Sequence, residues 1–163
     1  MKHSQKRKRT RLKPLSMPTE EDWGDYHSDL DQKHAHSVFA GRTNAEMQPF
    51  FRRNPIEMTD ELRWMPDAPF RYYILGFRDF VMAGDFDFLD SSDAANCFLD
   101  LVVEKFEKHP RLMVPVMPEL LSTVEYVAKN QELFSADEAI YGSFLEKLSR
   151  IETLYAPYAS LNR

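Results

Sequence analysis

The sequence predicts an all-α fold, an irregular bundle of about five to seven helices preceded by a disordered basic N-terminal arm. Apolar residues recur at helical spacings of three and four through most of the 163 residues. Residues that favour helix starts precede these segments, and glycine or proline follows most of them. The competing strand signal, at residues 112–117, is short and is interrupted by Pro115.

Composition indicates one folded domain, expected to span residues 19–163. Apolar residues make up 43% of the chain and aromatic residues 13%, which is enough to form a continuous core. The single cysteine, Cys97, excludes an intramolecular disulfide and a multi-cysteine zinc site, and it fits a reducing compartment. The N-terminus lacks the apolar stretch of a signal peptide, and no segment approaches the roughly 18 apolar residues of a membrane span. A cytoplasmic location is therefore expected.

Charge is distributed unevenly along the chain. Residues 1–13 hold seven Lys and Arg residues and no acid, whereas the remainder holds 14 basic and 26 acidic residues, a balance of −12. The basic run has no apolar periodicity and ends at Pro14, so residues 1–18 are expected to form a disordered arm. The sequence leaves open whether translation starts at Met1 or at Met17. The folded body is expected to be strongly acidic.

The first helix is expected to begin near Thr19 and to stop at Gly41. Its stripe follows spacings of four, three, four and four: Trp23, His27, Leu30, His34 and Val38. Thr43 and Glu46 form a capping box that opens a short helix ending before residue 55. Thr59 is expected to cap another short turn, which stops at residue 66.

The strongest periodic segment covers residues 67–83, and Gly84 ends it. Its apolar stripe consists of Phe70, Tyr73, Ile74, Phe77, Phe80 and Val81. We expect this helix to be central to the core. A further helix should run from Ser92 to residue 109, and Pro118 suits the first turn of the next one. Ser135 and Glu138 predict a second capping box, opening a long C-terminal helix through residue 155.

The motif search does not favour an enzyme, and no cofactor is expected. The sequence contains no glycine-rich phosphate loop, nucleophile elbow, zincin helix or deaminase signature, and it has only five glycines. Cys97 precedes Phe98 within an apolar helical pattern, which favours a small core residue over a nucleophile.

The best metal candidates are His27, Asp31 and His34, at positions i, i+4 and i+7 of the predicted first helix. They would define an alternative function, a small metal-dependent hydrolase. However, a straight helix seldom lets three ligands converge over two turns. Partly buried, hydrogen-bonded histidines are therefore the favoured interpretation.

An acidic cluster between two predicted helices consists of Asp85, Asp87, Asp90 and Asp93. It fails as a calcium loop, because Leu89 replaces an oxygen ligand and no glycine stands at the sixth position. A solvated acidic loop and helix cap is the favoured interpretation. Such a loop could also face a basic partner.

Adjacent aromatic or apolar residues suggest an exposed patch. Trp64 stands next to Met65, and Tyr72 next to Tyr73, so one member of each pair has to leave the core face of its helix. Trp64 and Tyr72 are accordingly candidate partner-binding residues. Packing within the core or at its edge is the simpler alternative.

The basic arm is the only part of the sequence that favours nucleic-acid binding. Its candidate phosphate contacts are Lys6, Arg7, Lys8, Arg9 and Arg11. No aromatic side chain is interleaved to stack bases, and the acidic body would be repelled. A nucleic-acid-associated adaptor is therefore a further alternative, acting through residues 2–13 alone. No membrane partner is expected.

The stretch WMPDAPFRYYILGFRDFV, residues 64–81, follows FAGRTNAEM at residues 39–47. Together they resemble the core of small bacterial helical proteins, some of which are similar to immunity proteins of polymorphic-toxin or contact-dependent inhibition systems. The resemblance covers about residues 20–155 and carries no functional residues across. It implies a cytosolic protein that binds and neutralises a cognate toxin domain. The acidic body independently favours a basic, nuclease-type toxin, with the four aspartates facing it and the aromatics anchoring the contact.

Overall fold

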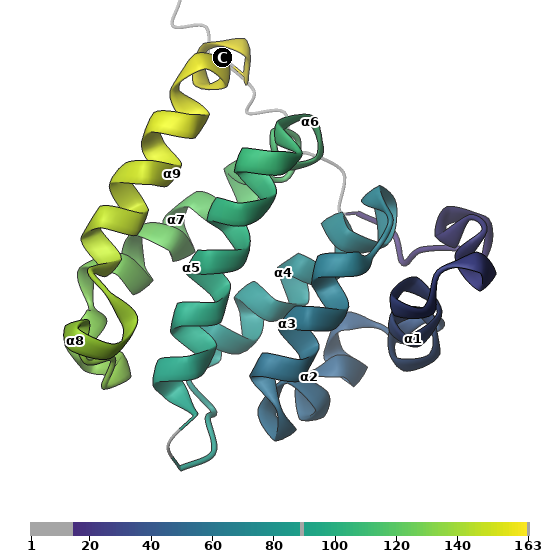
Figure 1. The fold of residues 1–163 in the computed structure, drawn as a ribbon, viewed down its shortest axis with the longest axis horizontal. Helices are drawn as coiled ribbons and strands as arrows, with labels where there is room; N and C mark the ends of the chain where they lie inside the picture. The colour runs from purple at the N-terminus through teal and green to yellow at the C-terminus, as the bar shows by residue number, and fades with distance from the viewer. Residues whose placement is uncertain (1–14, 89, 163) are drawn as a thin grey trace, which may run out of the picture.

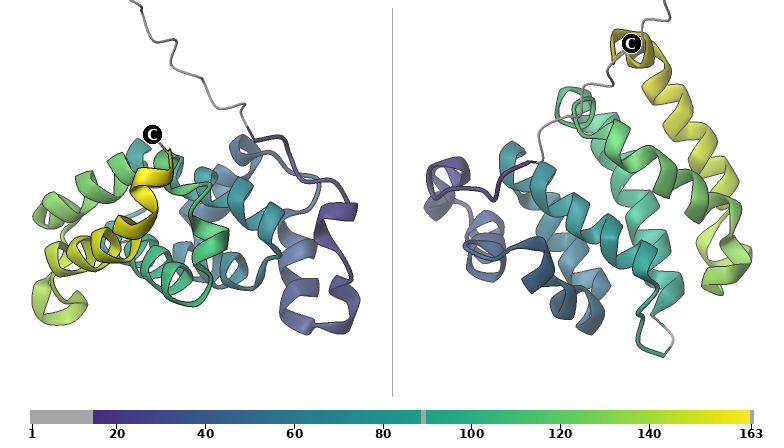
Figure 2. Two further views of the ribbon diagram at one scale, coloured as in Figure 1. Left: turned by 90° about the horizontal axis from the view of Figure 1, so that it is seen from above. Right: turned by 180° about the vertical axis from the view of Figure 1, so that it is seen from behind.

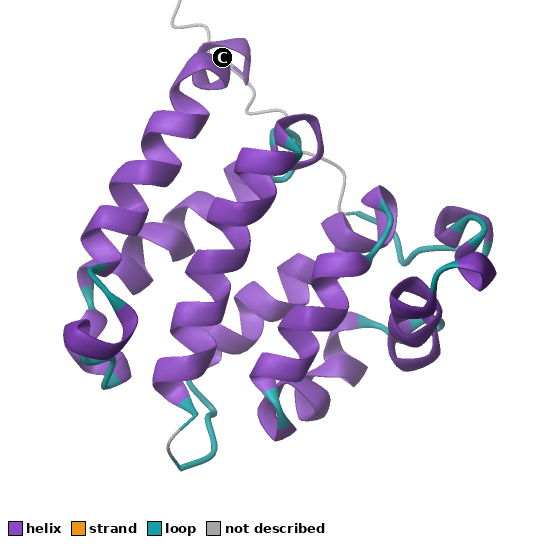
Figure 3. Ribbon diagram, viewed as in Figure 1, coloured by secondary structure: helices purple, strands orange, loops and turns teal. Residues whose placement is uncertain are grey.

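The computed structural model describes residues 15–88 and 90–162. Regular structure within these residues is entirely helical, which confirms the predicted all-α bundle (Figure 3). Nine α-helices occur in the described residues, and seven of them have at least ten residues. The other two, α6 and α8, have four residues each. The expected five to seven helices therefore correspond to the longer elements.

The α-helices are α1 (Leu30–Phe39), α2 (Asn44–Arg53), α3 (Pro55–Trp64), α4 (Asp67–Ala83), α5 (Ser91–Lys108), α6 (Pro110–Met113), α7 (Met117–Lys129), α8 (Glu138–Tyr141) and α9 (Phe144–Ala159). The 3-10 turns are η1 (Glu21–Trp23), η2 (Tyr26–Ser28), η3 (Gln131–Phe134) and η4 (Ser160–Asn162).

The helices form two irregular layers. In Figure 1, α1, α3, α5 and α9 follow one another across the molecule, and each contacts the next. Helices α4 and α7 lie behind them, as the rear view in Figure 2 shows, and α4 also contacts α2. No described helix has the length and apolar character needed to span a bilayer.

Helix α4 is the centre of the core, as its apolar stripe predicts. All six residues of that stripe are at most 2% exposed. Three of its aromatic rings contact rings of other helices: Tyr73 packs against Phe39, and Phe77 and Phe80 both stack on Phe51, with centroids 5.2 Å and 5.9 Å apart. The Tyr73 hydroxyl lies 2.7 Å from two carbonyl oxygens at the end of α1, those of Phe39 and Arg42. Burial raises the pKa of Tyr73, so this hydroxyl stays protonated and can donate.

Gly76 lets α2 approach α4 closely. A Cβ atom at this position would lie 2.3 Å from Oδ1 of Asn44. The Asn44 amide donates to the Tyr72 carbonyl at 2.9 Å, and Gln48 donates to the Gly76 carbonyl at 3.0 Å. Side-chain hydrogen bonds therefore fix this contact between the two helix backbones, and glycine leaves the space it needs.

The structure confirms three of the predicted helix starts and stops. The Thr43 and Glu46 capping box is present at the start of α2. Gly84 takes the left-handed conformation, with φ 70°, directly after α4. Pro118 lies in the first turn of α7, as expected.

The prediction of one continuous first helix from residue 19 to residue 40 is wrong. Gly24, with φ 59°, ends η1, and an extended Asp29 follows η2. The Asp29 side chain then accepts hydrogen bonds from the backbone N–H groups of Asp31 and Gln32, which starts α1. Leu30 is 81% exposed and so does not belong to an apolar face. The apolar periodicity of the sequence runs through this segment, but the helix itself begins only after the Asp29 cap.

Two predicted caps are also wrong. Asn54, and not Thr59, caps α3 by accepting from the Glu57 N–H, while Thr59 lies inside the helix and donates to the Pro55 carbonyl. Ser135 adopts a left-handed φ of 55° at the end of η3 and does not open a helix.

The long C-terminal helix begins later than predicted. Asp137 caps the one-turn α8, and Gly142, with φ 74°, ends that turn. Ser143 then accepts from the Glu146 N–H and opens α9. Ile140, expected on the buried stripe, is 73% exposed.

The basic run of the predicted arm, in residues 1–14, lies outside the described residues. Residues 15–18 are described, and Pro18 is buried.

Cys97 packs against the core from α5, with part of its surface accessible. Burial raises the pKa of its thiol to about 11, and the Thr59 side chain nearby counteracts this only in part. A protonated thiol of this kind has little nucleophilic character.

We predict that Gly76→Ala lowers the free energy of unfolding by about 1–3 kcal/mol, because the added methyl group overlaps Asn44. Urea denaturation measures the change, with Ser149→Ala on the exposed face of α9 as a control for helix propensity. Asn44→Gly should reduce the effect of Gly76→Ala in a double-mutant cycle. Additive effects would argue against this contact.

We also predict slow alkylation of Cys97 in the folded protein. Its pKa of about 11 compares with 9.0 for an unperturbed thiol, so the thiolate fraction near pH 8 is lower by about a hundredfold. Iodoacetamide labelling with and without urea, followed by mass spectrometry, measures the ratio. Equal rates would contradict the burial of this thiol.

Candidate functional site

Two segments that are distant in sequence form one end of the bundle. The loop between α4 and α5 lies beside η3 and α8, at the lower end of the molecule in Figure 1. The Phe86 and Phe134 rings contact each other with centroids 6.0 Å apart, and Ser91 donates to the Phe134 carbonyl at 2.9 Å. We call the surface of residues 85–88, 90–93 and 131–141 the acidic end.

The acidic end has a high density of negative charge. Its segments contain no Lys or Arg, and their seven acids are Asp85, Asp87, Asp90, Asp93, Glu132, Asp137 and Glu138. All but Asp90 and Asp93 are exposed. Glu132, Asp137 and Glu138 add to the four aspartates that the sequence singled out, so two segments share one strongly negative surface.

Large apolar side chains project from the same surface. Phe88 is 93% exposed, Ile140 73% and Leu133 66%. Phe88 lies between the acidic residues of the loop, while Leu133 and Ile140 each neighbour a residue that packs toward α5, namely Phe134 and Tyr141. Exposed apolar groups framed by charge are typical of protein contact surfaces.

Part of this charge is already paired. Arg52, at the end of α2, binds Asp87 at 2.9 Å and Asp85 at 3.3 Å. All three side chains are about half exposed or more, so the ion pairs contribute little to stability and remain open to exchange. Arg52 thus links the loop that carries the two carboxylates to the end of α2.

Asp90 and Asp93 do not face solvent in the way the sequence suggested. Both are half-buried. Asp93 accepts a hydrogen bond of 2.8 Å from the Tyr141 hydroxyl, which also lies 3.1 Å from the Ser92 hydroxyl. Asp93 therefore holds α8 against the start of α5, and its role is to position the acidic end.

The two predicted aromatic anchors lie elsewhere. Trp64 is 48% exposed, but it is the last residue of α3, the helix that starts next to Arg52. It is therefore separated from the acidic end by the length of a ten-residue helix, about 14 Å. Tyr72 is half-buried, and its hydroxyl lies 3.3 Å from the Asn44 nitrogen. Neither residue shares a surface with the aspartates.

The proposed metal ligands do not form a common helix face. His27 lies in η2 with its ring tilted by 34° against that of Tyr26, whereas Asp31 and His34 lie in α1. No group of three His, Cys, Asp or Glu residues within residues 15–88 and 90–162 is arranged to hold a metal ion. The break before α1 is the physical reason, because the spacing of 27, 31 and 34 depended on one continuous helix.

His34 instead pairs with an acid of another helix. Its Nδ1 lies 2.5 Å from Oε1 of Glu61, whose side chain is only 10% exposed. Burial raises the pKa of Glu61, and the hydrogen bond from His34 opposes that rise. This contact joins α1 to α3 and confirms that His34 is hydrogen-bonded, but the expectation that the two histidines are partly buried is wrong, because His27 and His34 are both exposed.

The candidate nucleic-acid contacts Lys6, Arg7, Lys8, Arg9 and Arg11 lie outside the described residues. Sequence reasoning missed the contribution of Leu133, Ile140 and Glu132, because a long helix through this region was expected to bury Ile140. Gly142 followed by Ser143 was the available signal: a helix stop directly before a helix cap.

No family model matches the chain, and the searches of curated proteins and of solved structures found no match either.

Proposed function

We propose that this protein is a binding module for a basic protein partner, and that the acidic end is its contact surface. The observation that carries the proposal is Phe88, which is 93% exposed in a loop between Asp87 and Asp90. Full exposure of a phenylalanine loses the stabilisation that burial of such a side chain provides, about 1.5–3 kcal/mol. A partner that covers this ring would recover that free energy.

Charge complementarity supports a basic partner. Seven acids and no base stand in the segments of the acidic end, and Arg52 pairs with only two of them. A surface of this sign steers a positively charged protein and speeds its association at low salt. Exposed Leu133 and Ile140 supply apolar area beside the charge, so steering and desolvation act at one place.

A cognate nuclease-type toxin is the specific partner that the sequence resemblance implies. A nuclease carries positive charge where it holds phosphate, and a set of carboxylates fits the same groups. In this proposal the protein neutralises such a toxin by occupying or covering its basic surface. The residues that act would be Phe88, Leu133 and Ile140 as apolar contacts and the exposed acids as counter-charges.

We predict that Glu132→Lys combined with Glu138→Lys weakens binding of the partner and so reduces its capture, because it reverses two exposed charges at the acidic end. The matched control is Glu21→Lys with Glu152→Lys, which changes net charge equally on distant exposed positions. Affinity capture from the native organism at about 50 mM and about 500 mM salt, read by mass spectrometry, compares them with wild type. Wild type and control should retain one basic protein at the lower salt.

The captured protein is then purified for kinetic measurements. The double charge reversal should lower the association rate constant by about tenfold, whereas Phe88→Ser should mainly raise the dissociation rate constant. A version that starts at Met17 should bind equally, and its failure would place the contact in the arm. Capture of no basic protein, or equal loss with the control variant, would reject the acidic end as the contact surface.

A further inference from the structure

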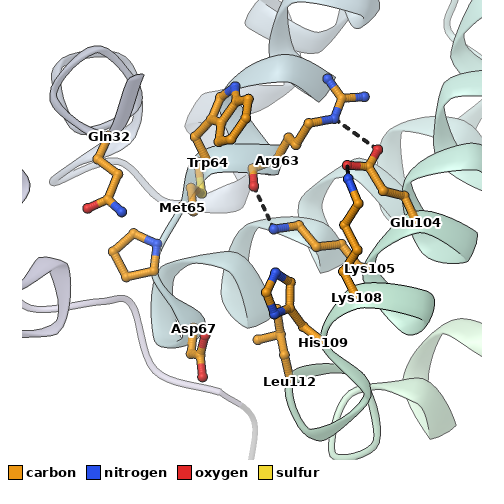
Figure 4. Close-up of a pocket in the computed structure, with 11 residues that line it drawn as sticks. Gln32, Arg63, Trp64, Met65, Asp67, Glu104, Lys105, Lys108, His109 and Leu112 are labelled. Carbon is orange, nitrogen blue, oxygen red and sulfur yellow. Dashed lines mark hydrogen bonds and ion pairs between the residues drawn. The ribbon is translucent and has the colours of Figure 1, made fainter. Parts of the chain in front are cut away.

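A second surface feature lies at the opposite end of α5. A cavity of about 300 Å³ opens between the end of α3, the end of α5 and α6 (Figure 4). Its walls come from Trp64 and Met65 on one side and from His109 and Leu112 on the other. The acidic end begins at the first turn of α5 and this cavity at the last, about 25 Å away along the helix. The two sites are therefore separate.

Lys105 forms the inner part of the cavity and is only 5% exposed. Figure 4 shows its side chain extending between Met65 and His109. Nζ donates to the Arg63 carbonyl at 2.5 Å and lies 4.9 Å from the centre of the Phe70 ring. The protein therefore accepts a hydrogen bond from one of the three N–H groups of the ammonium. The face of the Phe70 ring also stabilises the positive charge.

No carboxylate of the described residues forms an ion pair with Lys105. Glu104, the nearest acid in sequence, is engaged by other cations: Arg63 binds one of its oxygens and Lys108 the other, each at 3.0 Å. Burial of an ammonium is costly unless an anion pairs with it, and Lys105 has the charges of Glu104 and Asp67 nearby but no direct ion pair with either. Burial accordingly lowers the pKa of Lys105.

The charge of the walls limits the kind of anion. Asp67 and Glu104 line the cavity together with Arg63, Lys105 and Lys108. Arg63 also pairs with Asp60 outside the cavity, so the charges in and around the cavity balance, and Lys105 is the one of these three cations that forms no ion pair within the described residues. A dianion such as phosphate would meet two carboxylates, whereas a single negative charge would be matched by Lys105.

Apolar side chains form part of the cavity wall: Trp64, Met65 and Pro66 lie on one side and Leu112 on the other. The Trp64 side chain is 48% exposed. A planar group can stack on an exposed indole and recover the apolar surface that Trp64 leaves in water. This explains the exposure of the predicted aromatic residue independently of the acidic end.

We propose that this cavity binds a small, planar monocarboxylate, with its carboxylate on the Lys105 ammonium and its ring against Trp64. The volume of about 300 Å³ lies at the lower limit of small-molecule sites and suits a compact ligand. The site is independent of the protein partner proposed above.

Benzoate is the test probe, and three related molecules separate the contributions. Acetate retains the charge without the ring, benzamide retains the ring without the charge, and phosphate carries a second negative charge. Titrations followed by calorimetry and by the NMR signal of the Trp64 indole N–H should show benzoate binding at least tenfold more tightly than each of the three. Equal binding of benzoate and benzamide, or shifts that spread away from Trp64, would overturn the proposal.

Variants of the full chain test the two walls separately. Lys105→Met keeps the length and apolar stem but removes the charge, and it should weaken benzoate binding at least tenfold. Lys129→Met, which removes an exposed charge on α7, is the matched control and should not change it. Should Lys105→Met fail to fold, Trp64→Ala replaces a half-exposed side chain and should weaken benzoate binding severalfold while leaving acetate binding unchanged. Unaltered benzoate binding in either folded variant contradicts the proposed site.

Discussion

The burial of α4 is the constraint on which the other helices depend. Two of its rings reach other elements of the core: Tyr73 contacts Trp23 of η1, and Phe77 contacts Phe98 of α5. Gly76 brings α2 close on one side, and the Tyr73 hydroxyl holds the end of α1 through backbone carbonyls. Helices α1, α2 and α5 are therefore placed by specific contacts with α4 as well as by apolar burial. The two ends of α5 carry the exposed features because its middle is part of this core.

Sequence reasoning predicted the elements whose signals are complete within a few residues. Helix α4 has a wide apolar stripe, and Gly84 can adopt the left-handed conformation that ends it. The errors in the first and last helices share one cause: the periodicity of three and four continued by chance across a cap. Asp29 and Ser143 each start a helix by binding backbone N–H groups, and that preference outweighs an apolar pattern running through the same positions. Periodicity alone does not distinguish one long helix from two short ones.

Of the features of the candidate site, only the negative charge could be predicted from the sequence. Asp85 and Asp87 stand in a loop after a strong helix stop, and their exposure follows from that position. The half-burial of Asp93 depends on Tyr141, which is 48 residues away, and no local pattern contains that contact. Contacts of Phe134 with Phe86 and with Ser91 bring the segment that contains Leu133 and Ile140 to the same end of the bundle as the loop that contains Phe88, so the apolar part of the surface could be recognised only in the folded chain.

Two opposing effects act on the Lys105 ammonium: the helix dipole stabilises it, and burial destabilises it by a larger amount. In sequence it is an ordinary basic residue of the last turn of α5, where the helix dipole favours a cation by about 0.3–1 kcal/mol and by at most about 2. The penalty for burying an unpaired ammonium is several kcal/mol, even after relaxation of the surroundings. The dipole, the Arg63 carbonyl, the Phe70 ring and the nearby charges of Glu104 and Asp67 together offset part of this cost, but none of them forms a direct ion pair with Lys105. An anion bound in the adjacent cavity, within reach of the remaining N–H donors, would compensate for the burial of Lys105. The position of Lys105 at the end of its helix does not provide that compensation.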